Sequence, residues 1–368
     1  MARPRLPVVA TLALAASLVI VLAGRLVLAA ADTLPTRLTD EEFWQLSEDL
    51  SEPNGYFRSD NLLSNELYYP EILPTLLRQA KAAGVYLGVG PEQNFNYIVA
   101  LRPKMVFITD VRRGNMHTQL MYKALFEMSS DRADFFGRLF TKKRPEGLTD
   151  ASTAGDIVAR YWDSTAVTEG EVVYKQNLQA IQDYLTKSPH RLPLSKEDLA
   201  GIEYVYYNFY WFGPSITYNS SQSGNSGRGN MATYADLMQA TDAEGVARSY
   251  LATEETFRFL KDLEARNLLV PVVGNFGGAK TLRAVGQYVR DRGATVSAFY
   301  LSNVEQYLTQ DGIWGQFCAN VATMPLDESS TFIRSGQRGF GRGGGGGLRN
   351  ELALMLTETR GCAAVAGF

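Results

Sequence analysis

Residues 85–95 read VYLGVGPEQNF, an apolar run that two glycines interrupt before helical spacing begins. This pattern is typical of a buried strand, a tight turn and the start of a helix. A second apolar run at 105–109 ends at Asp110, which lies 20 residues after Gly90. Strands that alternate with helices predict an α/β fold, with a mostly parallel sheet that helices cover on both faces.

The glycine turn and the acid together point to an adenosine-containing ligand. Gly88 and Gly90 carry no Cβ, so a ligand can approach the backbone closely at this turn. A carboxylate at the end of the next strand, that of Asp110, can accept both hydroxyls of a ribose. The alternative that this pattern leaves open is a tight strand-to-helix turn that binds nothing.

The residues after the second glycine favour a ligand without phosphates. A dinucleotide fingerprint has its third glycine at the position of Gln93, and Pro91 is expected to be the first helical residue. Glu92 then lies in the first helical turn, where its carboxylate competes with a pyrophosphate for free N–H groups. S-adenosylmethionine has no phosphate and carries a cationic ammonium and sulfonium, so it suits this loop better than NAD does.

Composition narrows the partners and the chemistry. The 368 residues are 45% hydrophobic and 20% charged, as in a globular protein, and the net charge of -3 gives no reason to expect nucleic acid. The two histidines, His117 and His190, are far apart in sequence, so a metal site built on a histidine pair is not expected. Cys318 and Cys362 can form one disulfide or remain two buried thiols, and both alternatives stay open.

The first 31 residues have the pattern of an export signal. Met1–Arg5 is basic, 6–24 is apolar and uncharged, and small residues precede Asp32, so cleavage after Ala31 is expected. An uncleaved inner-membrane anchor is the alternative, because the apolar run is near the length that spans a bilayer. In either case the body of the protein is expected outside the cytoplasm, in the periplasm or beyond the cell. A buried or amphipathic first helix is a third interpretation.

Residues 32–368 are expected to form one α/β domain with an insertion. Residues 145–230, of which about 145–200 are polar, are interpreted as this insertion, or as a cap over the sheet. An aromatic run at 203–214 is expected to pack in the core, although it could form a wall of the binding pocket. The glycine-rich segment 336–347 is expected to be a flexible connector rather than an RNA-binding segment.

A second strand–helix–strand pattern occurs late in the chain. Strands are expected at 268–273 and 295–301, with a helix at 281–291 between them. Helical spacing elsewhere predicts helices within 72–82, 115–140 and 172–185. Ligands of such folds bind beyond the carboxyl ends of the strands. The residues expected on that rim are Gly88, Gly90, Asp110, Asn275, Asn303 and Glu305.

These motifs carry a resemblance to known proteins. Leu87–Pro91 followed by Asp110 resembles motif I and the acidic second motif of class I S-adenosylmethionine-dependent methyltransferases. More specifically, the segments 64–66, 84–95 and 102–105 resemble a family of uncharacterised bacterial proteins with a methyltransferase-like fold. That match extends from Asn61 to about Glu305 and implies a Rossmann-like sheet.

The resemblance also implies a cofactor and the residues that hold it. Gly88 and Gly90 would line the methionine part of S-adenosylmethionine, and Asp110 would hold its ribose. Tyr86 stands where the methyltransferase pattern has an acid, and Glu92 stands in place of its third glycine. The residues expected to bind the cofactor are Gly88, Gly90, Glu92, Asp110 and Asn275.

The leading hypothesis is an exported or membrane-tethered methyltransferase-like protein whose methyl acceptor is unknown. Glu66 and Glu305 are the candidate catalytic bases, for an acceptor that must lose a proton. The alternative is a non-catalytic exported binding or scaffold protein that retains the fold without the cofactor. A hydrolase or nuclease that uses carboxylates of the same rim is a third hypothesis, although no serine or histidine motif supports it. The expected partners are a small-molecule ligand or an acceptor, with the membrane contacted only through residues 1–31.

Overall fold

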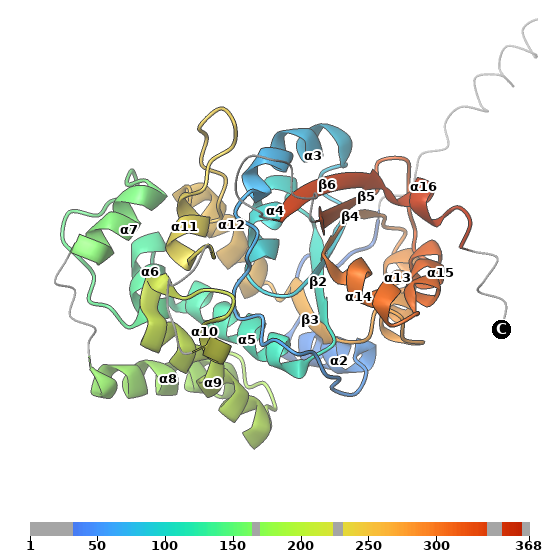
Figure 1. Ribbon diagram of the computed structural model, residues 1–368. Helices are drawn as coiled ribbons and strands as arrows, with labels where there is room; N and C mark the ends of the chain where they lie inside the picture. The colour runs from blue at the N-terminus through green and yellow to red at the C-terminus, as the bar shows by residue number, and fades with distance from the viewer. Residues whose placement is uncertain (1–31, 164–169, 224–230, 337–347, 363–368) are drawn as a thin grey trace, which may run out of the picture. The chain divides into compact units, whose positions relative to one another are not determined.

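A six-stranded sheet with the order β3-β2-β1-β4-β5-β6 is the centre of the fold (Figure 1). The computed structural model describes residues 32–163, 170–223, 231–336 and 348–362, and the described residues from Leu34 onwards form one compact unit. Strands β1 to β5 are parallel and β6 is antiparallel to β5, so the expected α/β fold with a mostly parallel sheet is confirmed. The strands are β1 Val85–Val89, β2 Met105–Asp110, β3 Leu269–Val273, β4 Val296–Ser302, β5 Thr331–Gly336 and β6 Arg349–Leu354.

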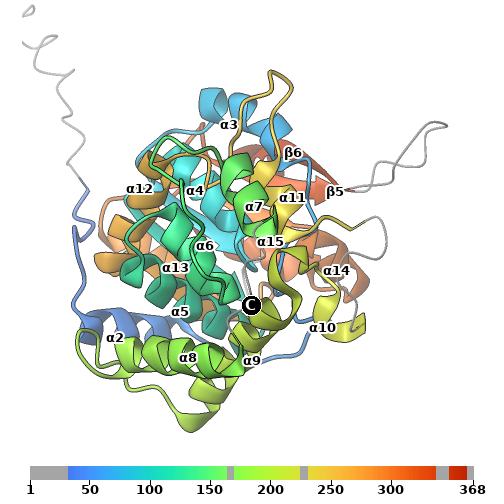
Figure 2. The ribbon, with the colours of Figure 1, turned by 90° about the vertical axis from the view of Figure 1, so that its left-hand side faces the viewer.

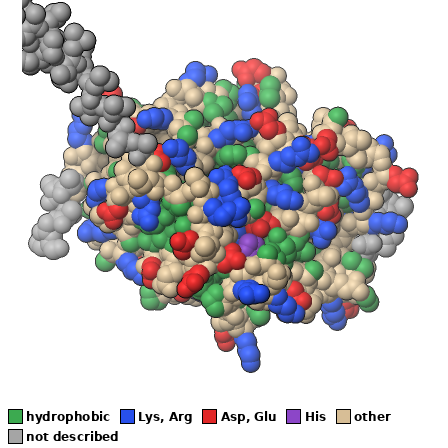
Figure 3. Space-filling view, turned by 180° about the vertical axis from the view of Figure 1, so that it is seen from behind, with side chains coloured by type: hydrophobic (Ala, Val, Ile, Leu, Met, Phe, Trp, Pro, Cys, Tyr) green, Lys and Arg blue, Asp and Glu red, His purple; other side chains and the backbone are tan. Residues whose placement is uncertain are grey.

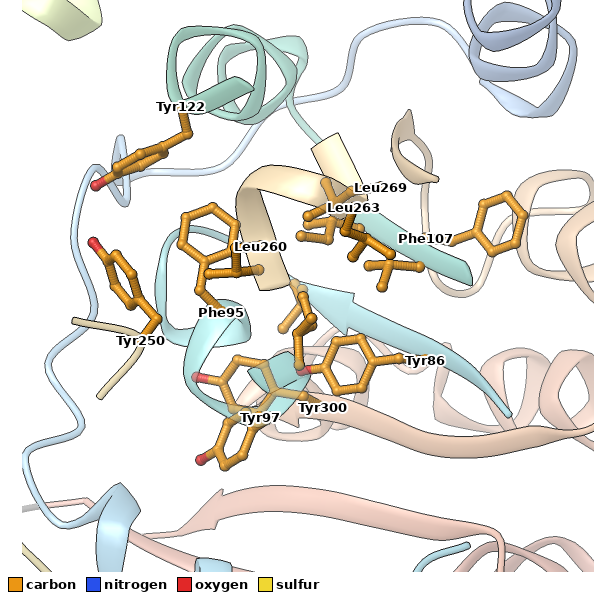
Figure 4. Packing of buried hydrophobic residues seen from close by; sticks show 14 of the residues in the cluster. Tyr86, Phe95, Tyr97, Phe107, Tyr122, Tyr250, Leu260, Leu263, Leu269 and Tyr300 are labelled. Carbon is orange, nitrogen blue, oxygen red and sulfur yellow. The ribbon is translucent and has the colours of Figure 1, made fainter. Parts of the chain in front are cut away.

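The central strands are buried on both faces. Every residue of β1, β2 and β3 is buried, which explains why these strands read as continuous apolar runs without alternation. Neighbouring residues of β4 point to opposite faces of the sheet. Tyr300 packs on Tyr97 (4.9 Å between ring centroids), whereas Phe299 packs on Phe317 of the opposite layer (6.3 Å). Figure 4 shows Tyr86, Tyr97 and Tyr300 gathered on one side, while Phe107 lies apart from them.

The two layers of helices come from different parts of the chain. Helices α4 Gln93–Leu101, α5 Arg113–Met128 and α12 Glu254–Ala265 pack together on one side of the sheet (Figure 1). Helices α13 Thr281–Asp291 and α15 Trp314–Ala322 pack together on the other side. Helix α2 Asp40–Leu50 begins with a capping box formed by Thr39 and Glu42, and it contacts β3.

The segment β3–α13–β4 does not form a unit of two adjacent strands, which the sequence did not indicate. Its strands, β3 and β4, do not pair with each other, because β3 pairs with β2 and β4 pairs with β1. Helix α13 therefore connects one edge of the sheet to the far side of β1. The strand order reverses between β1 and β4, and in open α/β sheets a crevice forms at such a point, beyond the carboxyl ends of the strands.

A long helical excursion separates β2 from β3. It begins at α5, before the expected insertion at 145–230, and it ends with α12. Figure 2 shows its helices in front of the sheet. The helix expected within 172–185 is confirmed as α8, whereas the helical segment 115–140 breaks at Ser129 into α5 and α6. The helices of the excursion that follow α5 are α6 Arg132–Phe140, α7 Ala154–Asp163, α8 Glu171–Thr186, α9 Lys196–Phe212, η2 Gly213–Ser215, α10 Ser220–Ser223, α11 Tyr234–Gln239 and α12.

The aromatic run at 203–214 forms most of helix α9. Tyr206 and Phe209 are buried in the core, whereas Tyr204, Tyr207 and Trp211 are 47%, 44% and 64% exposed. The expected core packing therefore holds for one face of the helix only. The helix expected within 72–82 is α3 Leu73–Gln79, and the short helix η1 Tyr69–Ile72 directly precedes it. The remaining helices are α14 Val304–Gln310 and α16 Met355–Thr359.

Cys318 of α15 and Cys362 form a disulfide, which decides between the two alternatives for the cysteines. The bond ties the segment after α16 back to the layer of α13 and α15, over a sequence separation of 44 residues. Within the described part of the chain, no helix has the length and hydropathy needed to cross a bilayer. The expected signal or anchor at residues 1–31 and the glycine-rich residues 337–347 lie outside the described residues.

Candidate functional site

A cavity of about 710 Å³ lies at the carboxyl ends of the central strands. Gly90 follows β1, Asp110 ends β2, Asn275 follows β3 and Ser302 ends β4, and all four line this cavity. The segment before α3 covers it from another side, with residues between Tyr56 and Asn65 in the lining. The reversal of strand order and the cavity therefore coincide, as expected for an open α/β sheet.

The two glycines of the turn have different roles. Gly90 lines the cavity with φ +75°, and no atom lies within 4 Å of the point where a Cβ would be. Gly88 does not line the cavity. A Cβ at Gly88 would overlap Oδ1 of Asn94, so its missing side chain makes room for this asparagine. The expected approach of a ligand to the backbone therefore concerns Gly90 alone.

Asn94 fixes the turn from within the protein. Its Nδ2 donates to three carbonyl oxygens of the turn, those of Val89 (2.9 Å), Gly90 (3.2 Å) and Pro91 (2.8 Å). Its Oδ1 accepts a hydrogen bond from the hydroxyl of Tyr86 (3.0 Å), and Nε2 of Gln119 also donates to Gly90 O (3.0 Å). Tyr86, which stands where the methyltransferase pattern has an acid, thus supports the turn through Asn94. Sequence reasoning missed Asn94, and no short motif marks it.

Glu92 occupies the amino end of helix α4 rather than the cavity. Its side chain is fully buried, and both carboxylate oxygens accept from the backbone N–H of Ser64 (3.1 and 3.3 Å). Burial, with a smaller contribution from the nearby carboxylate of Glu66, raises the pKa of Glu92 to about 8. Glu92 is therefore placed to hold the segment that covers the cavity, and its side chain makes no capping hydrogen bond to helix α4.

Asp110 has the geometry expected of a ligand-binding carboxylate. It is 4% exposed and lines the cavity. Its Oδ1 accepts from the backbone N–H of Arg112 (2.9 Å), and within the described residues Oδ2 has no hydrogen-bond partner. Burial raises the pKa of Asp110, although the guanidinium of Arg112 acts in the opposite direction. A donor that reached Oδ2 would compensate for part of this desolvation.

Three apolar side chains also belong to the lining. Val111 follows Asp110 directly, and Phe276 and Ile313 line the same cavity. Ile313 packs against the turn after β3, since a Cβ at Gly277 would lie 3.0 Å from its Cδ1. Flat apolar groups such as a purine fit between side chains of this kind.

Neither of the two candidate bases faces the cavity. Glu66 is fully buried and accepts hydrogen bonds from the hydroxyl of Tyr300 (2.7 Å), from Oγ of Ser302 and from Nδ2 of Asn350 (2.6 Å). It reaches the cavity only through Tyr300 and Ser302, which do line it. The prediction that Glu66 acts as a base in direct contact with a substrate therefore has no geometric support.

Glu305 lies outside the cavity, in a shallow surface depression beside α14. It forms an ion pair with Arg334 of β5 and accepts from Nε1 of Trp314 (3.1 Å). Asn303, the other residue expected after β4, does line the cavity. Of the six expected rim residues, the structure brings Gly90, Asp110, Asn275 and Asn303 together around one cavity and leaves Gly88 and Glu305 out.

The segment before α3 supplies lining residues that sequence reasoning missed. Arg58 lines the cavity, and its Nη2 donates to the hydroxyl of Tyr307 (3.1 Å), which also lines it. Among the described lining residues, Arg58 alone is positively charged, and Asp110 and Asp311 are negatively charged. Charged side chains of both signs are interspersed on the outer face shown in Figure 3. This segment has no regular structure, so its place over the cavity follows only from the tertiary fold.

Comparison with known proteins gives a family and no activity. Residues 62–342 match the model of a domain of unknown function, DUF7790, and no curated protein matches the chain. The matched region contains strands β1 to β5 and the lining residues Gly90, Asp110 and Ser302. The expected likeness to a family of uncharacterised proteins is confirmed, and no methyltransferase family is found. Because the match covers well over half of its length, the chain belongs to the DUF7790 family.

Proposed function

We propose that the cavity binds an adenosyl ligand without phosphates, and that the protein is an S-adenosylmethionine-dependent methyltransferase-like protein. The observation that carries the proposal is the meeting of Gly90 and Asp110, from neighbouring strand ends, in the lining of one cavity. The open space at Gly90 would admit the ligand close to the backbone. The Oδ2 atom of Asp110 would accept ribose hydroxyls, and the apolar side chains of Val111, Phe276 and Ile313 would contact the purine.

The amino end of α4 supports a ligand without phosphates. A pyrophosphate in this class of fold sits on the first free N–H groups of the helix after β1. Here Glu92 is the N-cap residue of that helix, and its buried carboxyl accepts from Ser64 and makes no hydrogen bond to the helix N–H groups. A phosphate at this end would lie next to the buried acid, whose charged form would repel it. This argument favours S-adenosylmethionine over NAD.

Methyl transfer from such a ligand needs little from the protein besides positioning. The bond between the methyl carbon and the sulfonium breaks, its electron pair returns to sulfur, and the methyl group bonds to a nitrogen or oxygen of the acceptor. Alignment of the two reactants supplies most of the acceleration in a displacement of this kind. Since Glu66 and Glu305 do not face the cavity, the proposal favours an acceptor that is already a free nucleophile.

Binding without catalysis is the second candidate function, and the positions of Glu66 and Glu305 outside the cavity favour it. Both expected bases are engaged in hydrogen bonds or ion pairs elsewhere, as in a protein that keeps a ligand site and performs no reaction. Incubation with S-adenosylmethionine and a panel of amines and hydroxyl compounds distinguishes the two candidates. Formation of S-adenosylhomocysteine supports transfer, and binding without turnover supports the non-catalytic protein.

Substitution Asp110→Asn tests the ligand. Titration calorimetry of the full-length protein with S-adenosylhomocysteine is expected to show a loss of affinity of about 10- to 100-fold, the value of hydrogen bonds to a charged group. In the native protein, affinity should rise with pH through the raised pKa of Asp110 and then level off, because the ionised carboxylate is the better acceptor. Asp311→Asn, which removes another lining carboxylate, is the matched control. Equal affinity in the native protein and Asp110→Asn would contradict the proposal.

We also propose that the protein is exported, with residues 1–31 as a cleaved signal or, alternatively, as an inner-membrane anchor. The disulfide between Cys318 and Cys362 supports an oxidising compartment. Cell fractionation followed by amino-terminal sequencing is expected to find mature protein that begins at Asp32, outside the cytoplasm. Uncleaved protein in the membrane fraction would indicate the anchor, and uncleaved protein in the soluble cytoplasm would refute export.

A further inference from the structure

The wall of the cavity at the end of β4 is backed by a buried carboxylate. Glu66 is fully buried, and its three described partners are all donors: the hydroxyls of Tyr300 and Ser302 and the amide nitrogen of Asn350. An amide nitrogen can only donate, so at least one partner requires the carboxylate to accept. Tyr300 and Ser302 line the cavity and donate to this carboxylate, whereas Glu66 itself does not line it.

The direction of these hydrogen bonds decides what the wall can recognise. A hydroxyl has one proton to donate and two lone pairs with which to accept. Since Tyr300 and Ser302 each give their proton to Glu66, each presents only lone pairs to a ligand. These two hydroxyls can therefore accept hydrogen bonds from a ligand but cannot donate to it. A group rich in N–H donors fits them, and a carboxylate or phosphate does not.

The two hydroxyls are held in place by their surroundings. The ring of Tyr300 packs against that of Tyr97 (4.9 Å). Ser302 has φ 50°, and the pairing of β4 with β5 shifts register between Tyr300 and Ser302. A shift of this kind turns side chains at a strand end, and a left-handed serine is retained where the neighbouring structure fixes it. The acceptor pair is thus formed before any ligand arrives.

Most of the acceptor capacity of the glycine turn is already used. Each carbonyl oxygen has two lone pairs. That of Gly90 accepts from Asn94 and Gln119, and that of Pro91 accepts from both the side-chain and the backbone nitrogen of Asn94. A cationic amine in the cavity would therefore find its acceptors at the end of β4 rather than on the turn.

We propose that the hydroxyls of Tyr300 and Ser302 bind the protonated amine of the ligand, with Glu66 as the positioning residue and counter-charge beneath them. This inference rests on the proposed function, since it assigns the amino group of the methionine part of the adenosyl ligand. Glu66 touches no ligand atom. It sets the direction of both hydroxyl protons and supplies the negative charge that stabilises an ammonium nearby.

Three thioethers that differ only in their amino-acid part test the inference. They are S-adenosylhomocysteine, S-adenosyl-3-thiopropylamine, which lacks the carboxylate, and 5′-methylthioadenosine, which lacks both the amine and the carboxylate. Calorimetry of the full-length protein is expected to show that both amines bind at least about tenfold more tightly than 5′-methylthioadenosine, as a charge-assisted hydrogen bond predicts. Equal affinity for all three would overturn the inference and leave the proposed function standing. Absence of binding by all three would overturn the proposed function, and the inference with it.

Two variants connect this preference to the named residues. Glu66→Gln and Ser302→Ala are each expected to remove most of the preference for the amines and to change the affinity for 5′-methylthioadenosine by less than about threefold. Asp110→Asn should instead weaken all three ligands by the same factor. A general loss of structure would also weaken all three, so the ratio of affinities separates positioning from stability. If Glu66→Gln fails to fold, Ser302→Ala decides, and an unchanged preference in the variants that fold would overturn the inference.

Discussion

Substitution Gly88→Ala is expected to lower the free energy of unfolding by about 3 kcal/mol or more and to abolish ligand binding. The new Cβ would overlap Oδ1 of Asn94 and lie 2.9 Å from Cε1 of Tyr86. Asn94 cannot move aside without giving up its hydrogen bonds to the turn and to Tyr86, all of which are buried. Urea denaturation followed by circular dichroism measures the loss.

Gly90→Ala is the matched control for this prediction. Its Cβ would meet open space. The free energy of unfolding should therefore fall by only about 1–2 kcal/mol, which is the strain of an alanine in the left-handed region at φ +75°. The same Cβ would project into the region where the ligand is proposed to lie, so binding of S-adenosylhomocysteine should fall although the fold persists. A Gly88→Ala protein as stable as Gly90→Ala would show that Asn94 does not hold the turn.

Removal of the disulfide by Cys318→Ser with Cys362→Ser should lower the free energy of unfolding by about 4 kcal/mol. This value is the entropy that a cross-link over 44 residues removes from the unfolded chain. The oxidised native protein and the double variant are to be compared by urea denaturation with and without a reductant. The reductant should shift the midpoint of the native protein only. A midpoint that neither the reductant nor the substitutions change would contradict a stabilising role for the bond.

Local patterns in the sequence predicted strands β1 to β4 closely and gave no prediction of β5. Helix α13 begins and ends at the predicted residues, β3 differs from the prediction by one residue at one end, and β4 differs by one residue at each end. These elements are specified by runs of apolar side chains whose spacing depends only on neighbouring residues. The glycine at position 90 and the acid at 110 were identified for the same reason, since each stands directly at a strand end.

The parts that the sequence did not reveal depend on contacts between distant segments. Glu66 looked like a free carboxylate, yet its partners Ser302 and Asn350 are 236 and 284 residues away. Glu305 follows a strand at the correct edge of the sheet, but Arg334 of the next strand draws it out of the cavity. The two glycines are equivalent in a motif, and only the position of Asn94 distinguishes Gly88 from Gly90. Such pairings have no periodic signal in the chain.

The helical excursion between β2 and β3 also has a kinetic consequence. During synthesis β1 and β2 are complete long before β3 exists, since residues 111–268 must be made in between. Until then the outer edge of β2, later covered by β3, presents unpaired backbone groups on a strand whose first four residues are apolar. Closing so long a loop has an entropic cost that slows the pairing of β3 with β2. Nascent chains halted within the excursion should therefore be the species most prone to aggregate.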